Sequence, residues 1–357
     1  MKILTLLAAF VLGVSSLIPL IRLRQWWIRV FDFPRLQILV LGLTILVVYL
    51  VFWEIRHWAE GAILGLLVVG LLIQAWRILP YSPLYPKEVL GSARVDDEAS
   101  RGTIALLVAN VLMSNRDSDR LLRIIRDSDP DVIITLEPDG WWEQQLCVLE
   151  DDYPHTVREP RENRYGMLVH SRLELLNPEI KHLISDEIPS VHTRVRLASG
   201  AIVWLHCLHP EPPSPTEAEE STERDAELLI VGRKVRDRDE PTIVSGDLND
   251  VAWSFTTTLF QKISKLLDPR KGRGMFNTYH AEYPFMRWPL DHVFHSEHFT
   301  LQAMTRLPAF GSDHFPVCVR LTLHPAAAAI QEEVDSDQED REQAEERIEE
   351  AEQQEQM

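Results

Sequence analysis

Three apolar runs precede residue 80, and they constrain the fold more than any other feature because water cannot surround them stably. The runs are Ile3–Ile21, Leu36–Trp53 and Ala62–Leu79. Each is about as long as the roughly 20 residues that a helix needs to cross the hydrocarbon core of a bilayer. Aromatic side chains of the kind found at membrane–water interfaces flank the runs, at Trp26, Trp27, Trp53, Trp58, Trp76 and Tyr81. The sequence therefore predicts a multi-pass membrane protein, in an inner or plasma membrane, with a transmembrane region over residues 1–80.

The orientation of this region is less constrained than its existence. The first run starts with one charged residue, Lys2, and lacks a small-residue cleavage site, so we favour an uncleaved span over a signal peptide. The segment Arg22–Arg35 carries four arginines and is either an interfacial amphipathic helix or a charged loop. The positive-inside rule places it, and the chain after the third span, in the cytoplasm, whereas Lys2 on a short N-terminus favours the opposite orientation. We favour the cytoplasmic side.

The chain after the third run divides into a linker, a domain and a tail. Residues 81–102 are rich in proline, serine and charge, which is typical of a linker. Residues 103–324 form the predicted globular domain, with 24 Lys or Arg against 34 Asp or Glu. Residues 325–357 carry two basic residues against 13 acidic ones and have almost no apolar side chain after Val334. We therefore expect a disordered acidic tail or a lone helix.

The domain alternates helical and strand-like patterns, which predicts an α/β fold. Apolar runs typical of buried strands include Thr103–Ala109, Asp131–Glu137 and Pro241–Ser245. Amphipathic or long helical patterns lie between them, as at Asp117–Arg126 and Glu217–Arg236. Roughly 220 residues are enough for one substantial core.

Polar residues of the kinds that bind metals and phosphates follow several of these strands. Asn110 comes directly after the first strand, and Glu137 ends the second. His209 lies beside prolines where another strand ends. Each residue taken alone is more often a turn, capping or surface residue, so their chemistry rests on the combination.

Two later motifs strengthen that combination. The segment Gly246-Asp247-Leu248-Asn249 follows a buried strand, and its glycine lets the backbone approach a ligand closely. Asp and Asn two residues apart face one site if the chain stays extended. Asp291-His292 and Ser312-Asp313-His314 each place a carboxylate next to an imidazole, and a carboxylate that orients an imidazole raises its basicity.

Together these residues resemble the ordered pattern of the endonuclease/exonuclease/phosphatase superfamily, which includes DNase I. That pattern is an early Asn, a Glu that ends a strand, a central His, GDxN, a late Asp and a final SDH. The matching residues are Asn110, Glu137, His209, Gly246–Asn249, Asp291 and Ser312–His314. One departure is Leu136, where the family commonly has Gln before the metal-binding Glu.

The resemblance implies a four-layer α/β/β/α sandwich of the DNase I type and hydrolysis of a phosphoester by direct attack of water. The implied cofactor is Mg²⁺, with Mn²⁺ as an alternative. It would be bound by Glu137 with Asn110 and Asp313 nearby. Asp247 would activate the water, and Asn249 would hold the water or a phosphate oxygen. The other implied catalytic residues are His209, Asp291 and His314.

Three further residues are candidates for contacts with substrate: Arg164, Tyr165 and Arg287. A lipid head group or small phosphoester is favoured over DNA, because duplex DNA binders normally carry a basic face and this domain has a net charge of −10. A membrane-tethered nuclease and a non-catalytic module that binds phosphate ligands on the same fold are the alternatives. No obligate protein partner is predicted.

Overall fold

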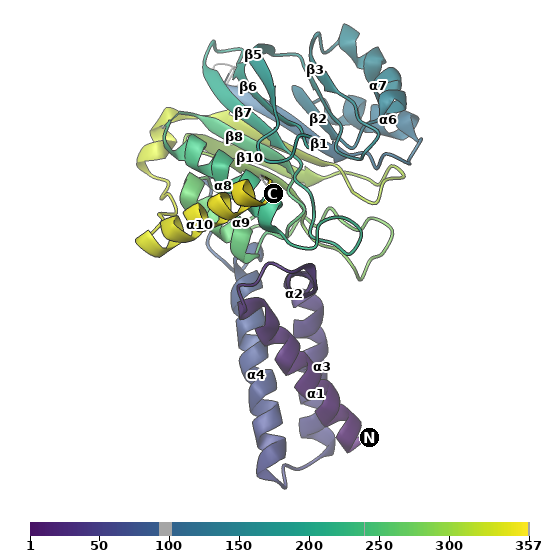
Figure 1. The fold of residues 1–357 in the computed structure, drawn as a ribbon, viewed down its shortest axis with the longest axis vertical. Helices are drawn as coiled ribbons and strands as arrows, with labels where there is room; N and C mark the ends of the chain where they lie inside the picture. Colours follow the sequence, from purple (N-terminus) through teal and green to yellow (C-terminus); the bar gives the residue numbers. More distant parts are fainter. Residues whose placement is uncertain (93–101, 239, 356–357) are drawn as a thin grey trace.

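The structure is a computed structural model that describes residues 1–92, 102–238 and 240–355. It has two parts, a stalk of long helices and an α/β domain at one end of it (Figure 1). The stalk is formed by the N-terminal third of the chain. The domain contains two β-sheets with helices on their outer faces, and the chain ends in a helix beside them.

The first sheet has six strands, and its centre is built from the apolar runs predicted as buried strands. Strand β1 pairs in parallel with β2 and antiparallel with β11, so the last strand of the domain returns to the middle of the sheet. The strands in spatial order are β10 (Phe299–Arg306), β11 (Val317–Leu323), β1 (Thr103–Asn110), β2 (Val132–Leu136), β4 (Met167–Ser171) and β3 (His155–Glu159).

The second sheet has five strands and also places a parallel pair near its centre. Strand β8 pairs in parallel with β7 and antiparallel with β9. The strands in spatial order are β5 (Glu174–Lys181), β6 (Ser190–Arg196), β7 (Ile202–Leu208), β8 (Thr242–Asp247) and β9 (Asp291–His295).

Apolar side chains from both sheets pack against each other and form the largest core cluster, which includes Leu106, Ile134, Leu205 and Val293. Helices α6 (Ser118–Ser128) and α7 (Gly140–Leu146) cover the outer face of the first sheet. Helices α8 (Thr222–Arg236) and α9 (Phe255–Ser264) cover the outer face of the second. The predicted four-layer α/β/β/α sandwich is therefore confirmed.

Three helices of the stalk are long and apolar enough to cross a membrane. They are α1 (Lys2–Leu17), α3 (Arg35–Phe52) and α4 (Trp58–Ile78), and they agree with the three predicted spans. Helices α1 and α4 pack closely through small residues. A Cβ atom added at Gly70 would lie 2.8 Å from the Cβ atom of Ser16, and one at Gly13 would lie 2.9 Å from Cγ of Leu66. Small residues allow such close approach between membrane helices, so α1 is an integral part of the bundle.

The segment between α1 and α3 joins the stalk to the domain. It contains α2 (Trp26–Arg29) and the 3₁₀ turn η2 (Val30–Asp32), so the segment is partly helical, and it packs on the domain. The backbone N–H of Trp26 donates to the carbonyl of Glu219 at 3.0 Å. The indole N–H of Trp253 donates to the carbonyl of Asp32 at 2.7 Å. After α4, the hydroxyl of Tyr81 donates to the carbonyl of Ala252 at 2.6 Å.

The linker and the tail differ from the expectations for them. Of the linker expected over 81–102, residues 93–101 lie outside the described chain, and the preceding residues pack on the domain. Val89 is fully buried in the main core, and Glu88 pairs with Lys271 at 2.7 Å.

The tail, expected to be disordered or a lone helix, forms helix α10 (Gln338–Glu355), which is docked along α8 and α9 rather than isolated (Figure 1). Its buried residues Ala344, Ile348 and Ala351 repeat at helical spacing, so one narrow apolar face is enough to dock it.

Candidate active site

The sequence-predicted site residues meet in one cleft at the ends of the central strands of both sheets. The cleft has a volume of about 370 Å³. The predicted residues that line it are Glu137, Arg164, Tyr165, His209, Asp247, Asn249, Asp313 and His314. Asn110 and Asp291 lie directly behind this lining and hydrogen-bond to it. Arg287 is the only one of the predicted site residues that does not contribute.

The first sheet supplies Asn110 and Glu137, which lie at the adjacent ends of the parallel strands β1 and β2. The side-chain amide of Asn110 donates to Glu137 at 2.8 Å and to Asp247 at 3.1 Å. Its oxygen accepts the backbone N–H of Leu112 at 3.0 Å. Asn110 therefore holds two carboxylates in place across the gap between the sheets, with its N–H group rather than its oxygen directed at them.

Glu137 is a partly buried carboxylate whose donors are the Asn110 amide at 2.8 Å and the backbone N–H of Met113 at 3.4 Å. Burial raises its pKa, against the opposing influence of His209, of the Asn110 hydrogen bond and of His314. Its backbone adopts a left-handed φ of 61°, and its N–H donates to the carbonyl of Gly166 at 3.0 Å. Such a backbone is unfavourable for a side chain other than glycine, so the surrounding structure must hold this carboxylate in position.

The second sheet supplies the GDLN segment at the end of β8. Gly246 has a φ of 148°, and a Cβ atom there would lie 1.9 Å from the carbonyl oxygen of Leu208. Only glycine allows this close contact between β7 and β8. Asp247 accepts the backbone N–H of Asn249 at 2.9 Å, and the Asn249 amide donates to the carbonyl of Pro210 at 2.9 Å. Both side chains are therefore fixed where they face the cleft.

Asp291, His314 and Asp247 form a charged chain of one hydrogen bond and one ion pair. Nδ1 of His314 lies 2.8 Å from Oδ2 of Asp291, and its Nε2 lies 3.5 Å from Oδ2 of Asp247. Burial disfavours the charged imidazole, but the two carboxylates outweigh it and raise the pKa of His314 to about 10. The imidazole is therefore a cation at neutral pH, and it offers a charged donor to the cleft.

The SDH motif is tied to the first strand. The hydroxyl of Ser312 donates to the carbonyl of Asn110 at 2.8 Å and accepts the backbone N–H of His314 at 3.0 Å. This arrangement places Asp313 and His314 on the cleft wall.

His209, Tyr165 and Arg164 form a second wall of the cleft. The His209 and Tyr165 ring centroids are 5.4 Å apart, and Nδ1 of His209 is buried without a hydrogen-bond partner in the described chain. Tyr165 donates to Glu217, and burial together with this bond raises its pKa. Arg164 lies 3.6 Å from the same carboxylate. His209 is thus free to bind a ligand, whereas Tyr165 and Arg164 are held by Glu217.

Arg287 lies outside the cleft. It donates to the backbone carbonyl of Ala281 at 3.0 Å and lies over the ring of Phe315, 4.9 Å from its centroid. These contacts stabilise the loop that precedes β9, so the prediction that Arg287 contacts substrate has no support in the geometry.

The donor set fits a divalent cation that prefers oxygen ligands. Glu137, Asp247 and Asp313 line one cleft, and within the described residues no lysine or arginine forms an ion pair with any of them. One ligand atom each of Asp247, Asp291 and His314 also lies within 4.8 Å of the others. We interpret that second group as the charged chain above, because Asp291 already holds Nδ1 of His314. Glu137 forms no ion pair among the described residues and is the best candidate ligand.

Two residues at the site carry no signal in the sequence. Tyr279 forms a backbone bridge with His314, and the two ring centroids are 5.0 Å apart. Arg224, on α8, donates to the carbonyl of Asn249 at 2.9 Å. Both residues come from segments without a motif, and only the fold brings them to the cleft.

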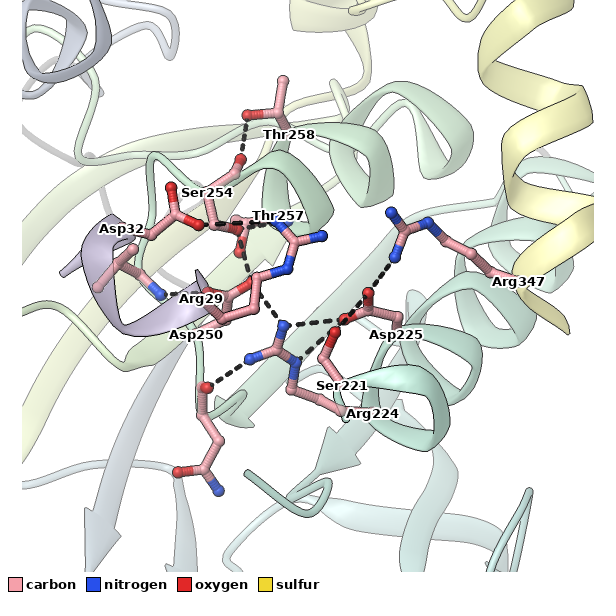
Figure 2. Close-up of polar contacts among 12 residues, drawn as sticks. Arg29, Asp32, Ser221, Arg224, Asp225, Asp250, Ser254, Thr257, Thr258 and Arg347 are labelled. Carbon is pink, nitrogen blue, oxygen red and sulfur yellow. Dashed lines mark hydrogen bonds and ion pairs between the residues drawn. The ribbon is translucent and has the colours of Figure 1, made fainter. Parts of the chain in front are cut away.

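Arg224 belongs to a buried ionic network behind the GDLN segment (Figure 2). It pairs with Asp225 at 2.9 Å and with Asp250 at 3.3 Å, and Arg347 of α10 also pairs with Asp225. Burial raises the pKa of Asp250 to about 6, although Arg224 opposes this. For Asp225 burial is outweighed by Arg224 and Arg347, and its pKa is lowered. The tail helix and the GDLN segment are therefore connected through one set of charges.

Comparison with known proteins agrees with this geometry. The sequence profile of the Endonuclease/Exonuclease/phosphatase family matches residues 107–314, which is more than half of the chain. The chain belongs to this family. Its enzymes hydrolyse phosphoesters and typically use divalent metals, so the chain is placed among phosphoester hydrolases in this general sense.

Solved structures of the endonuclease/exonuclease/phosphatase fold match the domain. An endonuclease/exonuclease/phosphatase from Beutenbergia cavernae has 20% identity and a TM-score of 0.52, over 63% of this chain and 72% of that one. A humanized TDP2 from D. rerio has 18% identity and a TM-score of 0.52, and the match covers 62% of this chain and 99% of that one. The human Nocturnin catalytic domain with bound sulfate has 16% identity and a TM-score of 0.51, and the match covers 62% of this chain and 95% of that one. No curated protein sequence matches the chain.

Proposed function

We propose that the protein is a membrane-anchored, Mg²⁺-dependent phosphoester hydrolase that acts by direct attack of water. The single observation that carries this proposal is the convergence of Glu137, Asp247, Asn249 and His314 in one cleft, from the ends of two sheets. Two carboxylates, an amide and a charged imidazole are the groups that phosphoester hydrolysis needs. A module that only binds phosphate has no use for a carboxylate positioned beside that anion.

The side chains have distinct roles in this reaction. Asp247 accepts a proton from the attacking water while the water oxygen forms a bond to phosphorus, and Asn249 orients that water. The imidazolium of His314 donates a hydrogen bond to the phosphoryl group, where negative charge grows in the transition state. As the ester P–O bond breaks, the departing oxygen takes a proton, which we assign to His209. Asp291 and Asn110 position His314 and the carboxylates.

The proposed metal ion is Mg²⁺, with Mn²⁺ as a substitute. Mg²⁺ prefers oxygen ligands, keeps several waters and needs only one or two carboxylates from a protein. Glu137 is the proposed ligand, supported by Asp313 and positioned by Asn110. When bound, the ion polarises phosphoryl oxygens and offsets negative charge. Its charge would also compensate the partly buried carboxylate of Glu137.

The membrane location is part of the proposal. Because Arg22–Arg35 packs on the domain, the two lie on the same side of the membrane, and the positive-inside rule makes that side cytoplasmic. Cys147 is exposed, whereas Cys207 and Cys318 are buried. A membrane-impermeant maleimide should therefore label Cys147 in inverted vesicles and leave it unlabelled in intact cells. The reverse pattern would contradict this orientation.

The function is tested with full-length protein in lipid nanodiscs, because Val89, Tyr81 and α10 all pack on the domain. Bis(p-nitrophenyl) phosphate, plasmid DNA and a phospholipid panel are the substrates, each assayed with Mg²⁺, with Mn²⁺ and with a chelator. We expect metal-dependent turnover that falls at least about 100-fold in Asp247→Asn and in His314→Gln.

Asp152→Asn is the matched control, since this carboxylate is exposed and far from the cleft. It should keep the activity of the unmodified protein. Turnover that survives chelation, or that is equal in Asp247→Asn and Asp152→Asn, would contradict the proposal. Turnover of plasmid DNA above that of the lipids would favour the tethered nuclease instead.

A further inference from the structure

A second cavity lies between the membrane anchor and the catalytic domain. It is an open groove of about 520 Å³ with mostly apolar walls. One wall comes from α2, η2 and the start of α3, and the other from two loops of the domain. Among its lining residues are Trp26, Val30, Phe33, Pro215, Phe285 and Trp288.

The groove adjoins the catalytic cleft. Phe33, Pro213 and Ser214 line both cavities. Phe33 lies between η2 and α3, so a residue of the membrane anchor forms part of the wall of the catalytic cleft. The ring of Phe33 also packs edge-on against Trp288, with centroids 5.5 Å apart. A molecule bound in the cleft can therefore extend into the groove without leaving the protein surface.

The groove also lies at the level where the chain enters the membrane. Gln37, in the first turn of α3, donates a hydrogen bond to the carbonyl of Phe285 at 2.8 Å. The side chain of Phe285 is 87% exposed and its neighbour Met286 is 52% exposed. Two large apolar side chains beside the first turn of a membrane-spanning helix are placed to contact lipid rather than water.

The groove wall contains two polar atoms without partners. Nε1 of Trp288, a donor, and Oε1 of Gln37, an acceptor, are buried, and neither has a hydrogen-bond partner in the described chain. Both residues line the groove. Buried donors such as the Trp288 N–H are normally satisfied. A ligand with an apolar chain and ester oxygens near its phosphate would satisfy this donor and fill the apolar space.

We infer that the groove binds an acyl chain of a membrane phospholipid whose phosphate group lies in the catalytic cleft. This inference rests on the proposed hydrolase function and names the substrate class for the same site. The lipid enters from the bilayer beside α3. Its phosphate reaches Asp247 and His314, and its glycerol esters lie near Trp288. Phe33, at the junction of the two cavities, separates the polar reaction from the apolar chain.

The first test uses n-alkyl phosphates as inhibitors of bis(p-nitrophenyl) phosphate hydrolysis by the full-length protein in nanodiscs. Butyl, hexyl and octyl phosphate share one head group and differ only in chain length. We expect the inhibition constant to fall by up to about fourfold for each added methylene, the value for burying one such group. A constant that is independent of chain length would overturn the inference. Absence of any hydrolysis would instead contradict the proposed function.

Partition of the inhibitors into the nanodisc bilayer would also give a chain-length effect, so variants are needed. Phe285→Asp places a charge at the exposed mouth of the groove, and Val148→Asp is the matched control at an exposed apolar site on the far side of the domain. We expect the chain-length dependence to weaken in Phe285→Asp and to persist in Val148→Asp. Equal dependence in both variants would show bilayer partition only and would overturn the inference.

A third measurement does not depend on activity. A phospholipid with a diazirine in its acyl chain is incorporated into the nanodisc and photoactivated, and labelled peptides are identified by mass spectrometry. We expect labels within residues 283–288 and 26–34 in addition to those on the membrane helices. Labels confined to α1, α3 and α4 would show that no acyl chain enters the groove.

Discussion

The substitution Asp291→Asn tests the charge state of His314, because it keeps the shape of the side chain and removes its charge. Asp291 lies 2.8 Å from Nδ1 of His314, and both groups are buried. Both charges are delocalised over their groups, and at about 4 Å between the charge centres a full charge contributes about 4 kcal/mol with an effective dielectric constant near 20, which corresponds to about three pKa units. The pKa of His314, raised to about 10 in the native protein, should therefore fall to about 7 in the variant.

The direction of the pH effect follows from these values. The native imidazole stays protonated through neutral pH and loses its proton only near pH 10. In the variant it loses its proton near neutrality. If the imidazolium is the active form, the variant should retain most of its protonated fraction at pH 6 and only about 3% of it at pH 8.5. The ratio of native to variant kcat should therefore be about 30-fold larger at pH 8.5 than at pH 6.

The assay is hydrolysis of bis(p-nitrophenyl) phosphate by full-length protein in nanodiscs, from pH 6 to pH 8.5 at saturating Mg²⁺. Loss of imidazole orientation should also reduce kcat by the same factor at every pH, so the ratio between the two pH values isolates the charge. Asp152→Asn supplies the control for removal of one carboxylate. A native-to-variant ratio that stays constant across this range would refute the assignment of a charged His314.

Two further predictions concern stability and are measured by thermal unfolding in nanodiscs. Arg347→Met removes one partner of the buried pair with Asp225, which should cost about 3 kcal/mol of folding stability and lower Tm by roughly 6–12 °C. The control Arg341→Met, on an exposed part of α10, should leave Tm unchanged. Equal Tm values for the two variants would show that the tail helix is not docked. Gly246→Ala places a Cβ atom 1.9 Å from the carbonyl oxygen of Leu208, so it should destabilise the fold by about 3 kcal/mol or more and abolish hydrolysis, and a variant with native Tm would contradict the close contact between β7 and β8 at this turn.

The sequence was a good guide to the buried strands of the fold and a poor one to three partly exposed edge strands. Buried central strands such as β1, β2 and β8 carry continuous apolar runs, which are easily recognised. Strands β3, β5 and β10 lie at sheet edges, where one side of the strand faces solvent, and none of the three was predicted. Strand β5 is largely exposed, so its sequence contains little apolar periodicity.

Helix and tail boundaries depended on contacts that are distant in sequence. The helix expected from Glu217 begins at Thr222 because the residues before it pair with the anchor, as in the bridge between Gln25 and Glu220. The tail helix had a readable signal in Ala344, Ile348 and its neighbours at helical spacing. The many acidic residues of this helix made it look disordered in the sequence, because the basic side chains that pair with them lie in other elements of the fold.

The site was predictable where one strand end carries one functional residue. Asn110, Glu137 and Asp247 follow apolar runs, and the fold brings the ends of those strands together. Arg224 could not be found in this way because it reaches Asn249 from the middle of a helical pattern. Arg287 was chosen for its closeness in sequence to Asp291, but its side chain points to loop carbonyls instead.

The central claim is that water attacks at phosphorus in the cleft and that the reaction needs Asp247. The most direct measurement is the hydrolysis of bis(p-nitrophenyl) phosphate in ¹⁸O-labelled water by the full-length protein with Mg²⁺, followed by mass spectrometry of both products. The account predicts one ¹⁸O atom in p-nitrophenyl phosphate, none in p-nitrophenol, and loss of both products in Asp247→Asn. Label in p-nitrophenol, or undiminished turnover by Asp247→Asn, would contradict it.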